Sequence, residues 1–201
     1  MKKKLLLINC YRDEAESRME FYLGWLRAGT AAVGLDLEML VLADTEPLPA
    51  GKDLVAAIIS GSQKMVAAGE TEPGLLEFIK NMRRPLLGIC YGHQALAAAF
   101  GCLVQRDGRK HLGDEEIIIK KAGGLFVGFP PVFKMRQSHE EIVARAPALE
   151  KNFLVTALNA SGRVESIAHK EHPLFGVQFH PEKSGEMGVK VLVNFLKMIK
   201  D

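Results

Sequence analysis

The first half of the chain alternates short apolar runs with longer segments whose apolar residues recur every three or four positions. A strand inside a parallel sheet is buried on both faces and reads as a continuous apolar run, whereas a surface helix shows the longer spacing. The expected strands are 5–9, 37–42, 56–60 and 85–90, and the expected helices are 14–34, 73–82 and 92–100. Repeated strand–helix units of this size predict a parallel sheet.

Beyond Gly101 the pattern changes to short strand-like segments separated by turns, and a helix with one apolar face follows them. The expected strands are 116–121, 132–137, 153–157, 164–170 and 175–179, and the expected helix is 185–200. We therefore expect an α/β fold. Its central sheet is mostly parallel, with helices on both faces and an antiparallel elaboration in the C-terminal half.

Length and composition fit one domain spanning residues 1–201. The 201 residues are close to a typical domain of roughly 150, and no linker, repeat or low-complexity segment divides them. Hydrophobic residues make up 48% and the net charge is +2, which excludes disordered, collagen-like and coiled-coil chains. The three cysteines, Cys10, Cys90 and Cys102, are too few for a disulfide scaffold and predict free thiols.

Several classes of location and partner are disfavoured. No basic stripe extends beyond 2–4, so a nucleic-acid partner is not expected. The apolar run after it is shorter than that of a secretory signal, and no stretch approaches the roughly 18 apolar residues of a membrane span. We expect a cytoplasmic chain with no membrane partner.

The most informative segment is an apolar strand that runs into Gly88-Ile89-Cys90-Tyr91-Gly92 and is followed at once by a helix. This is the cysteine form of the nucleophile elbow, a sharp turn that exposes its central side chain at the end of a sheet. The helix N-terminus favours a thiolate at Cys90. A buried cysteine between two turn glycines is the alternative, and the strand–turn–helix context disfavours it.

A thiolate nucleophile needs a proton carrier and a group that orients the carrier. His180 follows the buried-strand pattern 175–179, and Glu182 lies two residues further on. Glu182 can accept from one ring nitrogen and leave the other facing Cys90. An oxyanion needs N–H donors; we expect them from the backbone of Tyr91 and from the turn at Gly61-Ser62.

Together, the segments 88–94, 177–182 and 60–62 resemble the class I glutamine amidotransferases of the triad type. The resemblance covers essentially the whole chain. It implies hydrolysis of the side-chain amide of glutamine, with Cys90 as nucleophile, His180 as acid and base, and Glu182 as the orienting carboxylate. Ammonia then passes to a synthetase or synthase partner.

The same resemblance implies a glutamine-binding set. Gly61, Tyr91 and Gln94 match positions that hold or polarise the glutamine, with Ser62 beside them. Ser138 and His139 match a segment that cradles its α-amino and α-carboxylate groups.

Within the family, the stretch from 138 to 178 looks most like the glutaminase part of GMP synthetase. The segment 182–185 and the helix after it look like the glutaminase subunit of imidazole glycerol phosphate synthase. Two departures stand out: Ser62-Gln63 replaces the usual Gly-Pro, and His111-Leu112-Gly113 replaces an acidic–aromatic–glycine turn.

The glutaminase module accounts for the whole length, so we expect a separate synthetase subunit docked over the Cys90 edge. We expect no metal and no organic cofactor. His169 and His172 have ligand spacing, but at a strand end and turn their rings should diverge. Two other functions remain open: a free-standing hydrolase of γ-glutamyl amides or peptides, and a non-catalytic regulator.

Overall fold

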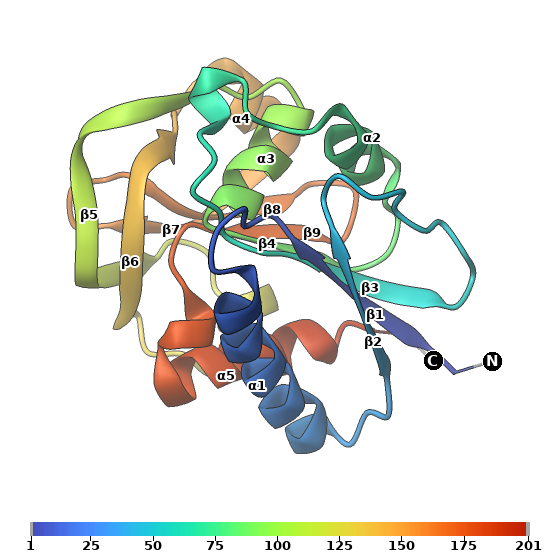
Figure 1. The fold of residues 1–201 in the computed structure, drawn as a ribbon. Helices are drawn as coiled ribbons and strands as arrows, with labels where there is room; N and C mark the ends of the chain where they lie inside the picture. Colours follow the sequence, from blue (N-terminus) through green and yellow to red (C-terminus); the bar gives the residue numbers. More distant parts are fainter. Residues whose placement is uncertain (1, 200–201) are drawn as a thin grey trace.

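The computed structural model describes residues 2–199 and contains one nine-stranded sheet (Figure 1). Five neighbouring strands are parallel. In spatial order they are β2 (Glu38–Ala43), β1 (Lys4–Asn9), β3 (Leu54–Ile59), β4 (Leu86–Ile89) and β9 (Leu174–Val177). The four apolar runs of the first half therefore form adjacent strands, as predicted.

The sheet continues from β9 through four antiparallel strands. They are, in spatial order, β8 (Val164–His169), β7 (Phe153–Asn159), β5 (Val104–Ile119) and β6 (Val132–Val143). Strand β9 is thus parallel to β4 on one side and antiparallel to β8 on the other. The predicted combination of a parallel sheet and an antiparallel elaboration is confirmed.

Helices cover both faces of the parallel strands (Figure 1). Helices α1 (Ala15–Val33) and α5 (Gly185–Leu196) pack on one face, and α2 (Pro73–Asn81) and α3 (Tyr91–Ala99) pack on the other. Strand β1 shows why. Its even and odd positions point to opposite faces, so Leu5 and Leu7 join the core beneath α1 and α5, while Leu6 and Ile8 join the core beneath α2 and α3.

The antiparallel strands are longer than the sequence predicts. Strand β5 begins at Val104 instead of 116, and β6 ends at Val143 instead of 137. Most of the added β5 residues are exposed, and only Val104 and Leu112 among them are apolar, so they carry no apolar pattern. Backbone pairing with β6 holds them in the sheet. Along β6 buried and exposed positions alternate, but several of the buried side chains are polar.

The remaining elements are short. Helix α4 (Pro147–Asn152) was not predicted, although it begins at a proline, and η1 (Val66–Ala68), η2 (Gly124–Phe126) and η3 (Pro181–Lys183) are single 3₁₀ turns. Helix α5 ends at Leu196, before the predicted end, and Lys200 lies outside the described residues. Within residues 2–199, no helix is long and apolar enough to cross a membrane.

Candidate active site

Cys90 occupies the turn between β4 and α3, with a backbone φ of 52° and ψ of −102°. A non-glycine residue rarely adopts positive φ, and such a conformation costs on the order of 1–3 kcal/mol. Two backbone hydrogen bonds hold it: the Cys90 N–H donates to the Val177 carbonyl at 2.8 Å, and the Gly92 N–H donates to the Ser60 carbonyl at 3.2 Å. The surrounding strands therefore impose the strained turn that the sequence predicts.

The two glycines of the elbow are required by close backbone approach. A Cβ on Gly88 would lie 2.3 Å from the Gly92 carbonyl oxygen, and a Cβ on Gly92 would lie 2.5 Å from that of Ile59. Both contacts are with backbone atoms, which cannot move aside as the end of a flexible side chain can. Any larger residue would push the helix away from the strand ends.

His180 and Glu182 lie just after β9, beside the elbow. The Nδ1 atom of His180 is 2.7 Å from Oε1 of Glu182, and both side chains are buried. Burial lowers the pKa of His180, but the Glu182 carboxylate and Cys90 raise it more, to about 10. Since Nδ1 faces Glu182, Nε2 is the ring atom left for Cys90, and among the described residues it has no other hydrogen-bond partner. The structure thus brings the three predicted catalytic residues together.

The Cys90 sulfur has two further polar neighbours. Its thiol donates to the carbonyl of Ser138 at 3.7 Å, and the Nε2 amide of Gln178 donates to the sulfur at the same distance. Ser138 itself is exposed, whereas Gln178 is buried. The reacting sulfur therefore lies between the end of β9 and the middle of β6.

The turn at Gly61-Ser62 follows β3 and reaches the same edge. The Gly61 N–H donates to the Tyr22 hydroxyl at 2.9 Å. The Ser62 hydroxyl donates to the Cys10 carbonyl at 2.6 Å and accepts from the Lys64 N–H at 3.0 Å. These bonds fix a turn that lacks the proline usual in its place.

On the other side of the elbow, Tyr91 is the first residue of α3. No carbonyl of the helix can accept its backbone N–H, so this donor is available beside the sulfur. A Cβ on Gly61 would lie 3.0 Å from Cε1 of His180, which places the Gly61 turn against the same imidazole. The two predicted sources of oxyanion donors therefore flank the histidine and the cysteine.

Gln94, one turn into α3, is buried and its amide nitrogen is engaged. It donates to the Glu141 carbonyl at 2.9 Å and to Oε1 of Gln178 at 3.2 Å. His139 bonds the same Glu141 carbonyl through Nδ1 at 2.9 Å. Burial lowers the pKa of His139 to about 4, so its ring is neutral at neutral pH and Nδ1 carries the proton.

The class-I glutamine amidotransferase family matches residues 23–199 of this sequence. This chain belongs to that family. Among its relatives, a glutamine-hydrolyzing GMP synthase subunit of Methanococcus aeolicus is 36% identical over 148 residues, which cover 73% of this chain and 75% of the relative. The same subunit of Methanopyrus kandleri is 34% identical over 179 residues, which cover 88% of this chain and 92% of the relative.

Solved structures of amidotransferases share the fold at lower identity. A candidate GMP synthase subunit from Thermoplasma acidophilum has a TM-score of 0.83 at 20% identity and covers 99% of this chain and 94% of its own. The glutaminase domain of Trypanosoma brucei CTPS, with bound acivicin, has a TM-score of 0.77 at 15% identity, covering 99% and 95%. The α/β arrangement around Cys90 is therefore that of this family.

Several residues at this amidotransferase site have no role predicted from the sequence. Gln178 lies within the segment 177–182 that carries the resemblance, and Tyr22 approaches from α1 with no local pattern to indicate it. The strict alternation of β6 could have revealed its inner face: Gln137, His139 and Glu141 are every second residue and all are buried.

A second histidine cluster supports His139 from β5. The His111 ring lies between Asp107 (Nε2 to Oδ2, 2.6 Å) and Glu115 (Nδ1 to Oε1, 2.8 Å), and it stacks on His139 with ring centroids 4.5 Å apart. Arg163 in turn pairs with Asp107 at 2.6 Å. The segment at 111–113 therefore forms a strand with a buried ion network, in place of the turn usual in the family.

Residues 2–199 contain no cluster of three or more histidine, cysteine, aspartate or glutamate side chains able to hold a metal ion. The prediction that the His169 and His172 rings diverge is wrong. They stack, with centroids 5.0 Å apart and planes 8° from parallel, because the turn after β8 folds back on the strand end.

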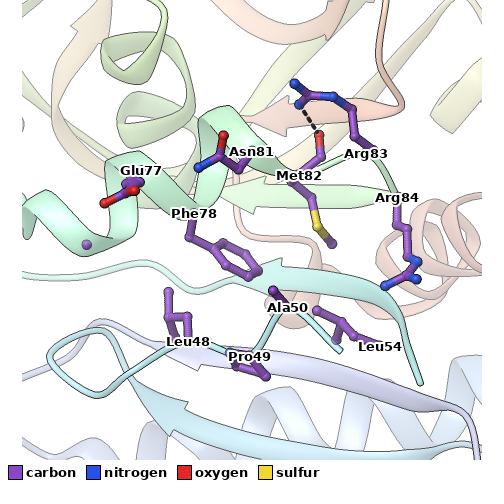
Figure 2. Close-up of a pocket in the computed structure, with 11 residues that line it drawn as sticks. Leu48, Pro49, Ala50, Leu54, Glu77, Phe78, Asn81, Met82, Arg83 and Arg84 are labelled. Atoms are coloured by element: carbon purple, nitrogen blue, oxygen red, sulfur yellow. Dashed lines mark hydrogen bonds between the residues drawn. The ribbon is translucent and has the colours of Figure 1, made fainter. Parts of the chain in front are cut away.

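A cavity of about 460 Å³ lies away from the elbow, between α2 and the loop before β3 (Figure 2). Phe78 of α2 faces Leu48 and Pro49 of the loop across it, as Figure 2 shows, and Met82, just after the helix, also lines the cavity. It includes none of the predicted site residues. The cavity is therefore separate from the sheet edge at Cys90.

Proposed function

We propose that residues 1–201 form one amidotransferase domain, which hydrolyses the side-chain amide of glutamine and supplies the ammonia to a separate synthetase subunit of a GMP synthase. The observation that carries this proposal is the placement of Cys90, on a strained elbow, beside the buried His180–Glu182 pair. Relatives named as subunits of a glutamine-hydrolyzing GMP synthase, covered over three quarters or more of their length, support the choice of acceptor enzyme.

The reaction begins with attack of the Cys90 thiolate on the amide carbon of glutamine. The backbone N–H groups of Tyr91 and Ser62 stabilise the oxyanion. His180, held protonated by Glu182, gives a proton to the departing nitrogen, so that ammonia leaves and a glutamyl thioester remains. His180 then takes a proton from water, which attacks the thioester and releases glutamate and the thiolate.

The remaining predicted residues bind the substrate in this proposal. Gly61 lies against the His180 ring, and the Ser138 carbonyl contacts the sulfur, with His139 next to it on β6. Ser138 and His139 would hold the α-amino and α-carboxylate groups of glutamine, and Gln94 would help to hold the substrate. No step requires a metal or an organic cofactor, since the thiol, the imidazole and backbone donors supply the nucleophile, proton carrier and oxyanion site.

The first experiment measures ammonia release from glutamine by the wild-type chain and by Cys90→Ala, in the presence of the synthetase subunit. We expect the alanine variant to lose activity by a factor of about 10³ or more, because the reaction has no other nucleophile. A glutamine-analogue electrophile should add to Cys90 of the wild type only. Wild-type rates in Cys90→Ala would contradict the proposal.

The second experiment compares the chain alone with the chain plus its synthetase subunit. Protonated ammonia is unreactive, so the partner should cover the Cys90 edge and shield the product. We expect weak hydrolysis by the chain alone and a marked increase on mixing. Strong turnover that no synthetase subunit changes would instead favour a free-standing γ-glutamyl hydrolase, and failure of the electrophile to label Cys90 would favour a non-catalytic regulator.

We also propose a cytoplasmic location for this activity. Cys10, Cys90 and Cys102 are all free thiols in the structure, which suits a reducing compartment. Separation of soluble and periplasmic or secreted fractions, followed by detection of the chain, tests the location directly.

A further inference from the structure

Behind the sulfur of Cys90 lies a chain of two buried amides that the reaction sequence above does not use. Gln178, at the end of β9, donates its Nε2 amide to Cys90 Sγ at 3.7 Å. Its Oε1 accepts from Nε2 of Gln94 at 3.2 Å, and the same Gln94 nitrogen donates to the Glu141 carbonyl at 2.9 Å. Gln178 has no exposed surface, and Gln94 is only 3% exposed.

This arrangement leaves one orientation for each amide group. The Glu141 carbonyl can only accept, so Gln94 must present its NH₂ to it and, with its second hydrogen, to Gln178. Gln178 must therefore use its oxygen toward Gln94 and its NH₂ toward the sulfur. Rotation of either amide by half a turn would bring two acceptors or two donors together in a site without exposed surface, at a cost of about 1–3 kcal/mol per orphaned group.

A donor fixed in this way acts on the charge of the sulfur. A hydrogen bond to an ionised acceptor is stronger than one to a neutral acceptor, and a donor bound to the charged form of an acid favours that form. The amide of Gln178 cannot lose its proton, so its contribution is present at every pH at which the chain is folded.

We propose that Gln178 is a further donor to the Cys90 sulfur, where its amide stabilises the thiolate form. Gln94 is the positioning residue that keeps the Gln178 amide in its donating orientation. This inference rests on the proposed role of Cys90 as nucleophile. It gives Gln94 a function toward the enzyme's own nucleophile in addition to its predicted contact with glutamine.

Four titratable side chains also face Cys90 from the elements packed against it. They are His180 and Glu182 after β9, Tyr11 after β1, and Tyr22 on α1. Burial raises the pKa of both tyrosines, so they stay neutral. All four remain in a Gln178 or Gln94 variant, so a change in thiolate content between variants reports the amides alone.

The test follows alkylation of Cys90 by iodoacetamide as a function of pH, without glutamine, with the Cys90 peptide quantified by mass spectrometry. In Gln178→Met we expect the half-maximal pH to rise by about 0.5–1 unit, and alkylation below it to slow by about three- to tenfold. In glutamine hydrolysis, kcat should fall while KM stays nearly unchanged. An unchanged alkylation profile in folded Gln178→Met would overturn the proposal.

Gln94→Met provides a second variant and a double-mutant cycle. Alone, it should shift the profile in the same direction by a smaller amount, about twofold in rate, because Gln178 keeps its donor but loses its anchor. Added to Gln178→Met, it should change nothing further. Additive shifts would mean that Gln94 acts independently of Gln178 and would overturn its positioning role. If Gln178→Met does not fold, an unshifted alkylation profile in Gln94→Met overturns the proposal.

The matched control is Asn194→Leu. Asn194 is also a buried amide, but it donates to the carbonyls of Leu125 and Val127 rather than to the sulfur. Its loss should lower stability and leave the alkylation profile unchanged. Alkylation needs no glutamine, so the two proposals can fail separately. If the Gln178→Met profile shifts but the wild-type chain does not hydrolyse glutamine, only the proposed function is contradicted. If the wild type is active but the Gln178→Met profile does not shift, only this inference is contradicted.

Discussion

The parallel and antiparallel halves of the sheet bury different kinds of side chain. The buried side chains of β1, β3 and β4 are aliphatic, and polar groups gather only where these strands end, as at Ser60. The antiparallel strands bury polar groups along their length. These are His111, Gln137, His139, Glu141, Asn159, Glu165 and Ser166. The parallel half carries Cys90 at the end of an aliphatic strand, and the antiparallel half supplies buried hydrogen-bonding groups beside it.

Strand β9 belongs to both halves, and this explains the position of the site. On its parallel side it pairs with β4, which carries Cys90 at its end; on its antiparallel side it pairs with β8. The residues just after β9 are Gln178 and His180. The nucleophile and its polar partners therefore meet at the boundary between an aliphatic and a polar interior.

Disrupting the close packing at the elbow should have the largest effect on the free energy of unfolding. In Gly92→Ala the new Cβ would lie 2.5 Å from the Ile59 carbonyl oxygen, so we expect a loss of more than about 4 kcal/mol in the free energy of unfolding, or no folding. Gly24→Ala is the control. Gly24 is exposed in α1 and nothing lies within 4 Å of a Cβ built on it, so this substitution should stabilise the chain by up to about 1 kcal/mol. Equal denaturation midpoints would show that close packing does not hold the elbow.

Measuring stability as a function of pH should show the effect of one buried carboxyl group in the antiparallel half, that of Glu165. Burial raises the pKa of Glu165 to about 8, while its partner Gln137 opposes this shift. The folded chain thus keeps a proton that the unfolded chain loses above about pH 4.5, so this group's contribution to stability falls as pH rises toward 8. Glu165→Gln should remove that fall. Between pH 5 and pH 8 the free energy of unfolding of wild type should therefore drop by about 1–4 kcal/mol more than that of the variant.

The difference between the stability curves of wild type and Glu165→Gln isolates the contribution of Glu165, because the other titratable groups contribute equally in both proteins. His93 is one of them. Burial lowers its pKa to about 3, so its contribution to stability rises with pH up to about 6.5, opposite in sign to that of Glu165. Parallel stability curves for wild type and Glu165→Gln would contradict a protonated Glu165 in the folded chain.

The smallest expected effect concerns the hydrogen bond between Tyr22 of α1 and the Gly61 turn. Tyr22→Phe leaves the buried Gly61 N–H without its acceptor, at a cost of about 1–2 kcal/mol in the free energy of unfolding. Tyr91→Phe is the matched control, because it removes a hydroxyl donor to the partly exposed Glu70 carbonyl, which water can satisfy. Equal losses in the two variants would mean that the Gly61 N–H finds another acceptor.

This contrast also explains what could be predicted from the sequence. Runs such as 5–9 and 85–90 are buried on both faces, so hydrophobicity alone locates them, and the turn glycines locate Cys90. The first part of β5 is mostly polar and exposed, and it is held by backbone bonds to β6 that leave no pattern in the side chains. Its extent therefore could not be predicted.

At the site, short spacing places His180 beside Glu182, and the ends of β3, β4 and β9 bring Gly61, Cys90 and His180 to one sheet edge, as predicted. The contacts of Gln94 with Gln178 and of Tyr22 with Gly61 link distant segments through side-chain ends. The spacing of apolar residues does not predict such contacts, because each contact depends on how a helix packs against the end of a strand. The roles of the glutamine-binding residues remain predictions.

The shared strand β9 is also the last strand of the sheet in chain order. A chain emerges from the ribosome N-terminus first, and 88 positions separate Cys90 from Gln178. The parallel strands β1 to β4 are complete long before β9 can insert beside β4. A chain truncated before β9 would therefore contain Cys90 without Gln178, His180 and Glu182, and we expect such a chain not to hydrolyse glutamine.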